Sequence, residues 1–307
     1  MVNHTSVTEF LILGFPEFPD LQIHLFTFFS LLYLMAILGN LLVVCIICVD
    51  RQLHIPMYFF LANLSALDIC TLTSIVPKML AILLAKNHNI SFVGCIVQMY
   101  CYTVCIDTEF ALLTAMAYDR YVAICNPLRY LNIMNKRACA ILAAASWTVG
   151  LVESLPHNII VSQFPFCVSN VINHFFCEMA ALVKLSGSDT SIIQTMNYIL
   201  GLFSVFLPFL LTLASYMFII STILKIRSSK GKSKAFSTCT SHLTVILLAY
   251  GTIIGVYMHP GSMDSADPNK LPIAMYIVTL PLLNPVIYSL RSKELKVALK
   301  KVIIKAH

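Results

Sequence analysis

Apolar residues follow one another along this chain in seven long runs, separated by short polar stretches. Each run holds roughly 20–30 residues, and about 20 apolar residues cross a lipid bilayer as a helix. The apolar positions are continuous rather than alternating, which argues against a membrane β-barrel. The pattern therefore predicts an all-α membrane protein, a seven-transmembrane helix bundle. The predicted helices lie at residues 23–49, 57–85, 93–122, 138–161, 194–225, 235–259 and 271–290.

Lys and Arg are distributed unevenly between the two ends of these helices. With the N-terminus outside, sixteen of the 20 fall on the inner side, and the other four are Lys78, Lys86, Lys184 and Lys270. Because cytoplasmic loops carry an excess of Lys and Arg, this bias predicts that orientation. We expect an extracellular N-terminus at residues 1–22, a helical domain at 23–290 and a cytoplasmic amphipathic helix and tail at 291–307.

Composition supports a membrane protein and excludes several other classes. The chain is 59% hydrophobic and 11% charged, whereas a soluble domain carries about 25% charged residues. The net charge of +6 follows from the membrane topology, so we expect no nucleic-acid partner. The chain holds no Gly-rich phosphate loop, nucleophile triad or metal-ligand spacing, so we expect no enzyme activity and no metal. Cys239 and His242 are interpreted as helix-packing residues.

Two features of the predicted exterior bear on modification. Asn3 begins an Asn-His-Thr sequon in the N-terminal segment, where it is a candidate for glycosylation. Cys95, Cys167 and Cys177 fall outside the membrane, where oxidising conditions permit one disulfide among them. The spacing alone leaves all three pairings open.

Charged and polar residues inside the helices form two groups by depth. Asn40, Asp68 and Glu109 lie about 14–16 Å from the inner face, and two carboxylates at one level need a shared proton or a cation between them. The sequence is equally compatible with a sodium ion between the two carboxylates and with a structural hydrogen-bonded cluster in which one acid is protonated. Asp107 and Glu153 share a level in the outer half, and either line an acidic cavity or form a buried pair that shares a proton.

Four motifs, in order along the chain, resemble those of the vertebrate odorant receptors. They are LHIPMYFFLANLSALDIC at 53–70, MAYDRYVAIC at 116–125, KAFSTCTSHL at 234–243 and PLLNPVIYSLR at 281–291. That family belongs to the rhodopsin-like G-protein-coupled receptors. The resemblance implies a receptor at the plasma membrane, in the sensory cilia of olfactory neurons, that binds a small volatile or hydrophobic ligand. It also implies activation of a stimulatory G protein that raises cyclic AMP.

The resemblance also implies roles for individual residues. It gives a disulfide between Cys95 and Cys177, and a sodium or proton site at Asp68, Glu109 and Asn284, with no other cofactor. Gly187 stands where the family usually has a further loop cysteine, so Cys167 is expected to be unpaired. The activation switch would consist of Asp119, Arg120, Tyr121, Tyr216, Asn284, Pro285 and Tyr288. By their position alone, Asp119 and Arg120 are equally well explained as an interfacial ion pair.

The family's ligand pocket lies in the outer half of the bundle, under the second outer loop. The matching positions are Tyr102, Cys105, Ile106, Asp107, Phe110, Glu153, Asn197, Leu200, Ser204, Tyr250, Ile253, Ile254, Tyr257, Ala274 and Ile277. Asp107 and Glu153 depart from the family's usual residues, which suggests a cationic odorant such as an amine. The alternative is that the two acids only brace neighbouring helices.

Apolar residues recur at helical spacing after the seventh run, with lysines between them, as in a helix that lies on the inner leaflet. Two other functions are compatible with the fold. A chemosensory receptor outside the olfactory system would share every motif. An ion-coupled transporter would also carry buried carboxylates, but it usually shows pseudo-symmetric halves and broken helices that are not visible here.

Overall fold

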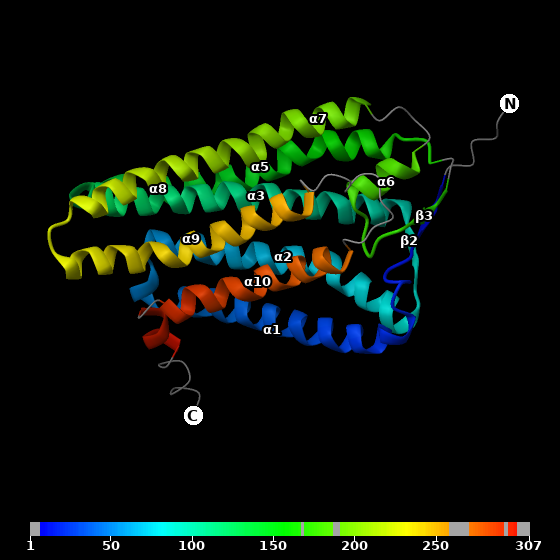
Figure 1. The fold of residues 1–307 in the computed structure, drawn as a ribbon, viewed down its shortest axis with the longest axis horizontal. Helices are drawn as coiled ribbons and strands as arrows, with labels where there is room; N and C mark the ends of the chain where they lie inside the picture. Colours follow the sequence, from blue (N-terminus) through cyan, green and yellow to red (C-terminus); the bar gives the residue numbers. More distant parts are fainter. Residues whose placement is uncertain (1–6, 167–168, 187–190, 258–269, 292–293, 300–307) are drawn as a thin grey trace.

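The computed structural model describes residues 7–166, 169–186, 191–257, 270–291 and 294–299. Long helices run side by side along the molecule's longest axis (Figure 1). A small sheet lies at one end, near the N-terminus, and the connection between α8 and α9 lies at the other end (Figure 1). We call these the sheet end and the basic end, because Lys225, Arg227, Lys230 and Lys232 surround that connection.

The prediction of seven membrane helices is confirmed. Six of the described helical stretches are long and apolar enough to cross a membrane, and α9 occupies the remaining predicted run up to residue 257. The long helices are α1 Gln22–Val49, α2 Pro56–Ala85, α3 Phe92–Cys125, α5 Lys136–Ser162, α7 Ser191–Gly201, α8 Leu207–Lys225, α9 Ser229–Tyr257 and α10 Lys270–Arg291. The short helices are η1 Pro19–Leu21, η2 Arg51–Leu53, η3 Pro127–Arg129, α4 Tyr130–Ile133 and α6 Met179–Leu185.

The fifth span is one continuous helical stretch with a change of winding in its middle. The π-helical segment η4, Leu202–Phe206, joins α7 to α8. Pro208, the second residue of α8, has no N–H group, so the regular bond to the carbonyl group of Ser204 cannot form. Such π segments are frequent at functional sites, and this one carries Ser204.

Residues 294–299 are also helical, and they hold two buried apolar side chains, Leu295 and Ala298. This agrees with the start of the predicted amphipathic helix. The rest of that prediction, residues 300–307, lies outside the described residues, as do Asn3 and Cys167.

A three-stranded sheet at the sheet end was not predicted from the sequence. Its strands are β1 Glu9–Ile12, β2 Asn89–Ser91 and β3 Val171–Ile172, in the order β2-β1-β3. β1 pairs antiparallel with β2 and parallel with β3. Strands of two to four residues are too short to show an alternating pattern. The sheet ties the N-terminal segment to the two loops on this side of the bundle.

The disulfide between Cys95 and Cys177 is present, which confirms the pairing that the resemblance implied. It joins the start of α3 to the loop between α5 and α7. The backbone N–H of Cys177 also donates to Gln98 Oε1, at 3.0 Å. The loop is therefore fixed to α3 by a covalent bond and a buried hydrogen bond.

Two aromatic residues and a histidine pack that loop against the bundle. The His174 ring lies 4.5 Å from the ring of Phe175 and 4.8 Å from that of Phe176. His174 is fully buried, with Nε2 3.3 Å from Glu178 Oε2. Burial, together with the nearby positive charge of Lys270, lowers the pKa of His174 to about 3. His174 is therefore neutral in the folded protein near pH 7.

Acidification is expected to destabilise the protein through His174. Its pKa is lower in the folded state, so the stability it contributes is complete above about pH 6.5 and falls as the pH drops toward 3. Between about pH 7.5 and 5.5 the loss is about 1.4 kcal/mol. Thermal unfolding of the purified protein at the two pH values measures this loss. His174→Phe should lose this part of the pH dependence, whereas the change His24→Phe at an exposed position should keep it.

Candidate functional site

The apolar part of the predicted ligand pocket is assembled from α3, α9 and α10. The ring centroids of Phe110 and Tyr250 lie 4.8 Å apart, and both residues are buried in one cluster with Cys105. Tyr102, Ala274 and Ile277 are buried in a second cluster nearer the sheet end, with Phe176 of the loop between α5 and α7. Ile106 packs against both clusters, so these positions form one region.

The loop between α5 and α7 closes over this region. The Tyr102 and Phe176 rings meet edge to face at 5.0 Å, and the disulfide holds Cys177 next to Phe176. The side chains of Ile253, Ile254 and Tyr257, which the sequence also predicted to line the pocket, lie outside the described residues. The described part therefore provides the α3 and α10 walls and Tyr250 at the base.

A polar cluster adjoins the apolar region between α3, α5 and the fifth span. Ser154 Oγ donates to Asp107 Oδ2 at 3.1 Å, and the Ser204 hydroxyl also interacts with this carboxylate. Glu153 lies near enough to repel Asp107 electrostatically. The sequence predicted that these two acids share one level, but it did not identify Ser154 as the partner of Asp107.

Several buried atoms in this cluster have no hydrogen-bond partner among the described residues. They are Glu153 Oε2, Asn158 Oδ1, His157 Nε2 and Asn197 Oδ1, although the His157 and Asn197 side chains interact with each other. Asn197 was predicted to line the pocket, whereas His157 and Asn158 were not. Leaving a buried polar atom unpaired costs about 1–3 kcal/mol. A group of such atoms beside an apolar region is therefore able to bind a ligand with a few polar groups.

A second buried polar cluster lies deeper in the bundle. Asn284 Nδ2 donates to Asp68 Oδ2 at 3.0 Å and to Oδ1 at 3.3 Å. Glu109 interacts electrostatically with Asp68, and Glu109 Oε1 has no partner among the described residues. The structure therefore brings together the three predicted residues Asp68, Glu109 and Asn284. Asn40 donates instead to the backbone oxygens of Ala36 and Pro281.

Four more buried oxygens near this level are unpaired among the described residues: Asn40 Oδ1, Ser65 Oγ, Asn284 Oδ1 and Tyr288 Oη. Carboxylate, amide and hydroxyl oxygens are the ligands that a hard cation prefers. A proton on one of the two acids would also remove their repulsion. In the part of the chain described here, no three His, Cys, Asp or Glu residues lie in a metal-binding arrangement.

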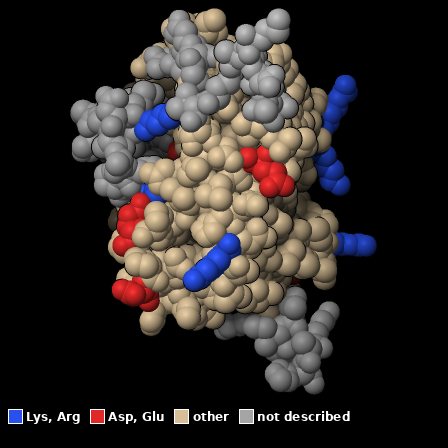
Figure 2. Space-filling model, turned by 90° about the vertical axis from the view of Figure 1, so that its right-hand side faces the viewer, with Lys and Arg blue, Asp and Glu red and all other residues tan. Residues whose placement is uncertain are grey.

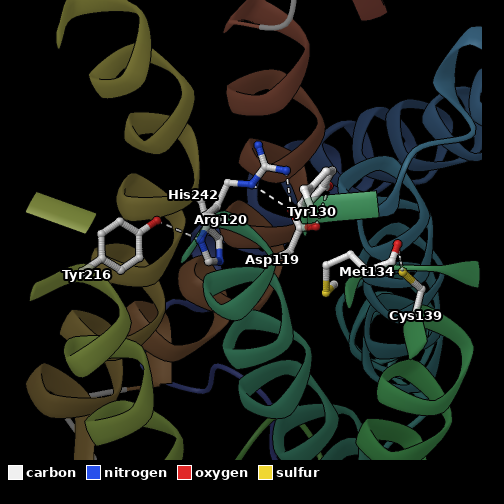
Figure 3. Close-up of polar contacts among 7 residues, drawn as sticks. All are labelled: Asp119, Arg120, Tyr130, Met134, Cys139, Tyr216 and His242. Atoms are coloured by element: carbon white, nitrogen blue, oxygen red, sulfur yellow. Dashed lines mark hydrogen bonds and ion pairs between the residues drawn. The ribbon is translucent and has the colours of Figure 1, made fainter. Parts of the chain in front are cut away.

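Two residues of the predicted switch, Asp119 and Arg120, are paired with each other at the basic end. Arg120 donates from Nε to Asp119 Oδ2 at 2.9 Å, and its Nη2 contacts the same oxygen. Tyr130 Oη of α4 donates to the other oxygen, Asp119 Oδ1, at 2.8 Å (Figure 3). Asp119 is fully buried and Arg120 is 8% exposed. An ion pair at the membrane–water interface would face water, whereas both of these side chains are buried.

Tyr216 and His242 form a contact that the sequence did not predict. The hydroxyl group of Tyr216 on α8 lies 2.9 Å from His242 Nδ1 on α9, and both side chains are buried (Figure 3). The sequence alone indicates only a packing role for His242. The KAFSTCTSHL motif placed it on the inner half of its helix, but the partner depends on how α8 and α9 are rotated. In this structure Tyr216 therefore fastens α8 to α9 instead of meeting Arg120.

Three other positions of the predicted switch, Tyr121, Tyr288 and Pro285, lie on α3 and α10. The ring of Tyr121 lies 5.9 Å from that of Phe218 on α8, and Tyr288 of α10 is buried. A Cβ atom added to Gly39 would lie 3.3 Å from Pro285 Cγ, so α1 and α10 approach closely at the α10 proline.

The surface of the sheet end, at the opposite end of the molecule, carries charged side chains scattered over a largely uncharged face (Figure 2).

Comparison with known proteins agrees with these features. The family model described as olfactory receptor matches residues 29–306. Human olfactory receptor 1F1 is 48% identical over 98% of this chain and 96% of its own length. Human olfactory receptors 13F1 and 5F1 are 46% and 47% identical, over 99% and 98% of this chain and 96% of each relative. These relatives are receptors, which rules out an enzyme or an ion-coupled transporter. The chain belongs to the olfactory receptor family, whose members are seven-helix membrane receptors.

Proposed function

We propose that this receptor binds a small odorant near the sheet end of the bundle and activates a stimulatory G protein at the basic end. The observation that carries the proposal is the placement of both clusters on α3. Asp107 of the polar cluster and Asp119 of the switch are twelve residues apart on this helix, or about 18 Å. One rigid helix therefore connects a ligand to the switch, and the G protein would raise cyclic AMP.

The orientation that fits this function has the N-terminus outside and the basic end in the cytoplasm. The excess of Lys and Arg at the basic end supports it. The disulfide at the sheet end supports it too, because disulfides persist in oxidising surroundings. Residues 1–22 would then be extracellular, residues 23–290 the receptor domain, and residues 291–307 the cytoplasmic tail. Its location would be the ciliary plasma membrane of olfactory neurons, with Asn3 glycosylated.

The switch residues would act by breaking the contacts described above. Release of Arg120 from Asp119, together with loss of the Tyr216–His242 contact, would free α8 and α9 to move apart. Tyr121, Tyr288, and the kink-permitting Pro285 would adjust with them. Glu109 Oε1 and Tyr288 Oη have no hydrogen-bond partner among the described residues. These two atoms could therefore form new hydrogen bonds when the helices move.

Asp68, Glu109 and Asn284 would hold a sodium ion or a proton in the resting state. Two observations support this proposal. The Asp68 and Glu109 carboxylates repel each other, and buried oxygen atoms near them have no hydrogen-bond partner among the described residues. Either species would link α2, α3 and α10, so its loss would accompany activation. The site is part of the signalling mechanism and carries no chemistry of its own.

The ligand would be a cationic odorant such as an amine. Asp107 and Glu153 supply negative charge, and Glu153 has an oxygen free of partners among the described residues. The apolar clusters around Tyr102, Phe110 and Tyr250 would hold the hydrocarbon part. A protonated amine would relieve the repulsion between the two acids and donate to the unpaired oxygens. The alternative, that the acids only brace α3 against α5, predicts no preference for amines.

A cyclic AMP assay in cells that express the full chain tests this proposal. A panel of amines, acids and neutral odorants should give responses mainly to amines. Asp107→Asn should raise the amine concentration for half-maximal response at least about 30-fold, because an unpaired buried charge costs about 2 kcal/mol or more. Receptor at the cell surface is measured in parallel.

Asp20→Asn is the matched control, because it makes the same change at an exposed position of the sheet end. It should leave every response unchanged. If neutral odorants activate the receptor and Asp107→Asn leaves their potency intact, then amine recognition is wrong and Asp107 is structural. If agonists raise no cyclic AMP but trigger another G-protein response, then the stimulatory coupling is wrong.

A further inference from the structure

A groove opens on the side of the bundle near the basic end, apart from the candidate ligand pocket and beside the α4 segment. It encloses about 780 Å³ between α1, α2, α5 and the α4 segment. Its walls include Ile47, Phe59, Ala66, Met134 and Cys139. Exposed apolar side chains border it, including Phe59 at 39% and Leu131 at 73%. Because α1, α2 and α5 are membrane helices, the groove faces lipid.

The length of the groove matches one leaflet of the membrane. Along α2 its lining extends from Pro56 to Ala66, which is about 15 Å of helix. The hydrocarbon core of a bilayer is about 30 Å thick, so one leaflet supplies about 15 Å. A groove of this length starts at the basic end of the bundle and ends near the bilayer centre. It therefore fits the acyl chain of a single lipid.

The two ends of the groove differ in polarity. At the basic end the lining includes His54, Asn135 and Lys136, and Lys136 is exposed and makes no ion pair within the described residues. At the deep end Trp147 Nε1 donates to Asn63 Oδ1 at 3.2 Å, and Asn63 Nδ2 donates to the Phe59 carbonyl. The polar atoms there are satisfied, so the deep end accepts hydrocarbon while the basic end offers a positive charge.

We infer that this groove binds one anionic phospholipid of the cytoplasmic leaflet, with an acyl chain against α2 and the phosphate at Lys136. The leaflet assignment rests on the orientation given under Proposed function, whereas the binding chemistry does not. A sterol would fill the apolar part but has no charge to meet Lys136. The free cation therefore favours an anionic phospholipid over a sterol or a zwitterionic lipid.

The groove is joined to the switch by a short chain of contacts. The Met134 N–H donates to the carbonyl of Tyr130 at 2.8 Å, and the Cys139 thiol lies 3.7 Å from the Met134 carbonyl. Met134 and Cys139 line the groove, and Tyr130 donates to Asp119 (Figure 3). A lipid in the groove would hold α4 in place and so keep Tyr130 on Asp119.

Native mass spectrometry of the purified full-length receptor tests the inference without an odorant or a G protein. The receptor in detergent is given equal amounts of phosphatidylserine, phosphatidylcholine and cholesterol. We expect one phosphatidylserine molecule to stay bound preferentially. Lys136→Gln should weaken its binding about fivefold, since one lysine near an anionic lipid contributes about that much. Ala66→Trp should fill the deep end and remove the bound lipid.

Two control variants separate a specific site from general attraction. Arg137→Gln removes the neighbouring charge, which does not line the groove, and Ala145→Trp adds the same bulk at an exposed position of α5 outside it. Both should retain the lipid. Equal losses in Lys136→Gln and Arg137→Gln, retention by Ala66→Trp, or preferential retention of cholesterol would each overturn the inference.

Hydrogen exchange of the same samples tests the link to the switch. Phosphatidylserine should slow amide exchange in residues 130–139 of the wild type. It should leave the exchange rate of the same residues unchanged in the Ala66→Trp variant. If the lipid binds but exchange in this segment stays the same, then the groove is a lipid site without an effect on Tyr130. A failure of odorant or G-protein signalling would affect neither measurement, so the two proposals fail independently.

Discussion

Gly150→Ala is expected to lower the stability of this receptor by about 3 kcal/mol and to remove most of the folded protein from the cell surface. Gly150 lies on α5 where it crosses α3. An added Cβ atom would lie 2.6 Å from the Val104 carbonyl oxygen and 3.1 Å from the Thr108 backbone nitrogen, and it would also collide with Thr108 Oγ1. Backbone atoms cannot rotate away, so the two helices would have to separate.

The size of this effect follows from the way membrane helices pack. Lipid is as apolar as the helix surfaces, so association depends on close contact at small residues. The crossing also positions Asp107 next to Ser154, so a shift there would disturb the candidate ligand site. Thermal unfolding of the purified receptor and surface labelling of cells measure the two consequences.

Gly201→Ala is the matched control on α7. A Cβ atom added at Gly201 meets no other atom within 4 Å, and alanine favours a helix over glycine by about 1 kcal/mol. This variant should be as stable as the wild type or slightly more stable. Equal unfolding temperatures for the two alanine variants would show that the α3–α5 crossing is not as tight as described.

Asp119→Asn is expected to produce the second large change, a receptor that signals without an odorant. Asp119 is the counter-charge of the buried Arg120 and also accepts from Tyr130. Removing one partner of a buried ion pair costs about 3–5 kcal/mol. This cost destabilises the inactive state, in which the ion pair is formed. The equilibrium between the inactive and active states should therefore shift toward the active state by about 100-fold or more.

Agonist-independent cyclic AMP, normalised to receptor at the surface, measures this shift, and thermal unfolding measures the accompanying loss of stability. Tyr130→Phe is the graded control, because it removes one hydrogen bond and no charge, at a cost of about 1 kcal/mol. The rise in basal signal should therefore be much smaller. Similar effects from both variants would mean that the ion pair contributes little to keeping the receptor closed.

The chain's amino acids by themselves determine which segments enter the membrane. Runs of apolar residues must leave water whatever their neighbours are, so the seven helices could be predicted from local composition. The motif resemblance added the family, and with it the Cys95–Cys177 disulfide and the grouping of Asp68 with Asn284. These residues sit in long motifs, so their positions could be recognised one by one.

Contacts between distant segments were decided only by the tertiary structure. The Tyr216–His242 hydrogen bond, the Ser154 partner of Asp107 and the lipid-facing groove all depend on the rotation of each helix about its axis. β1 has too few residues for its sequence pattern to predict a strand. It forms only because β2 and β3 lie beside it. The sequence thus specified the elements and many of the reactive groups, because length and polarity are local properties. Helix rotation and loop pairing set which groups meet, because both depend on the packing of the whole bundle.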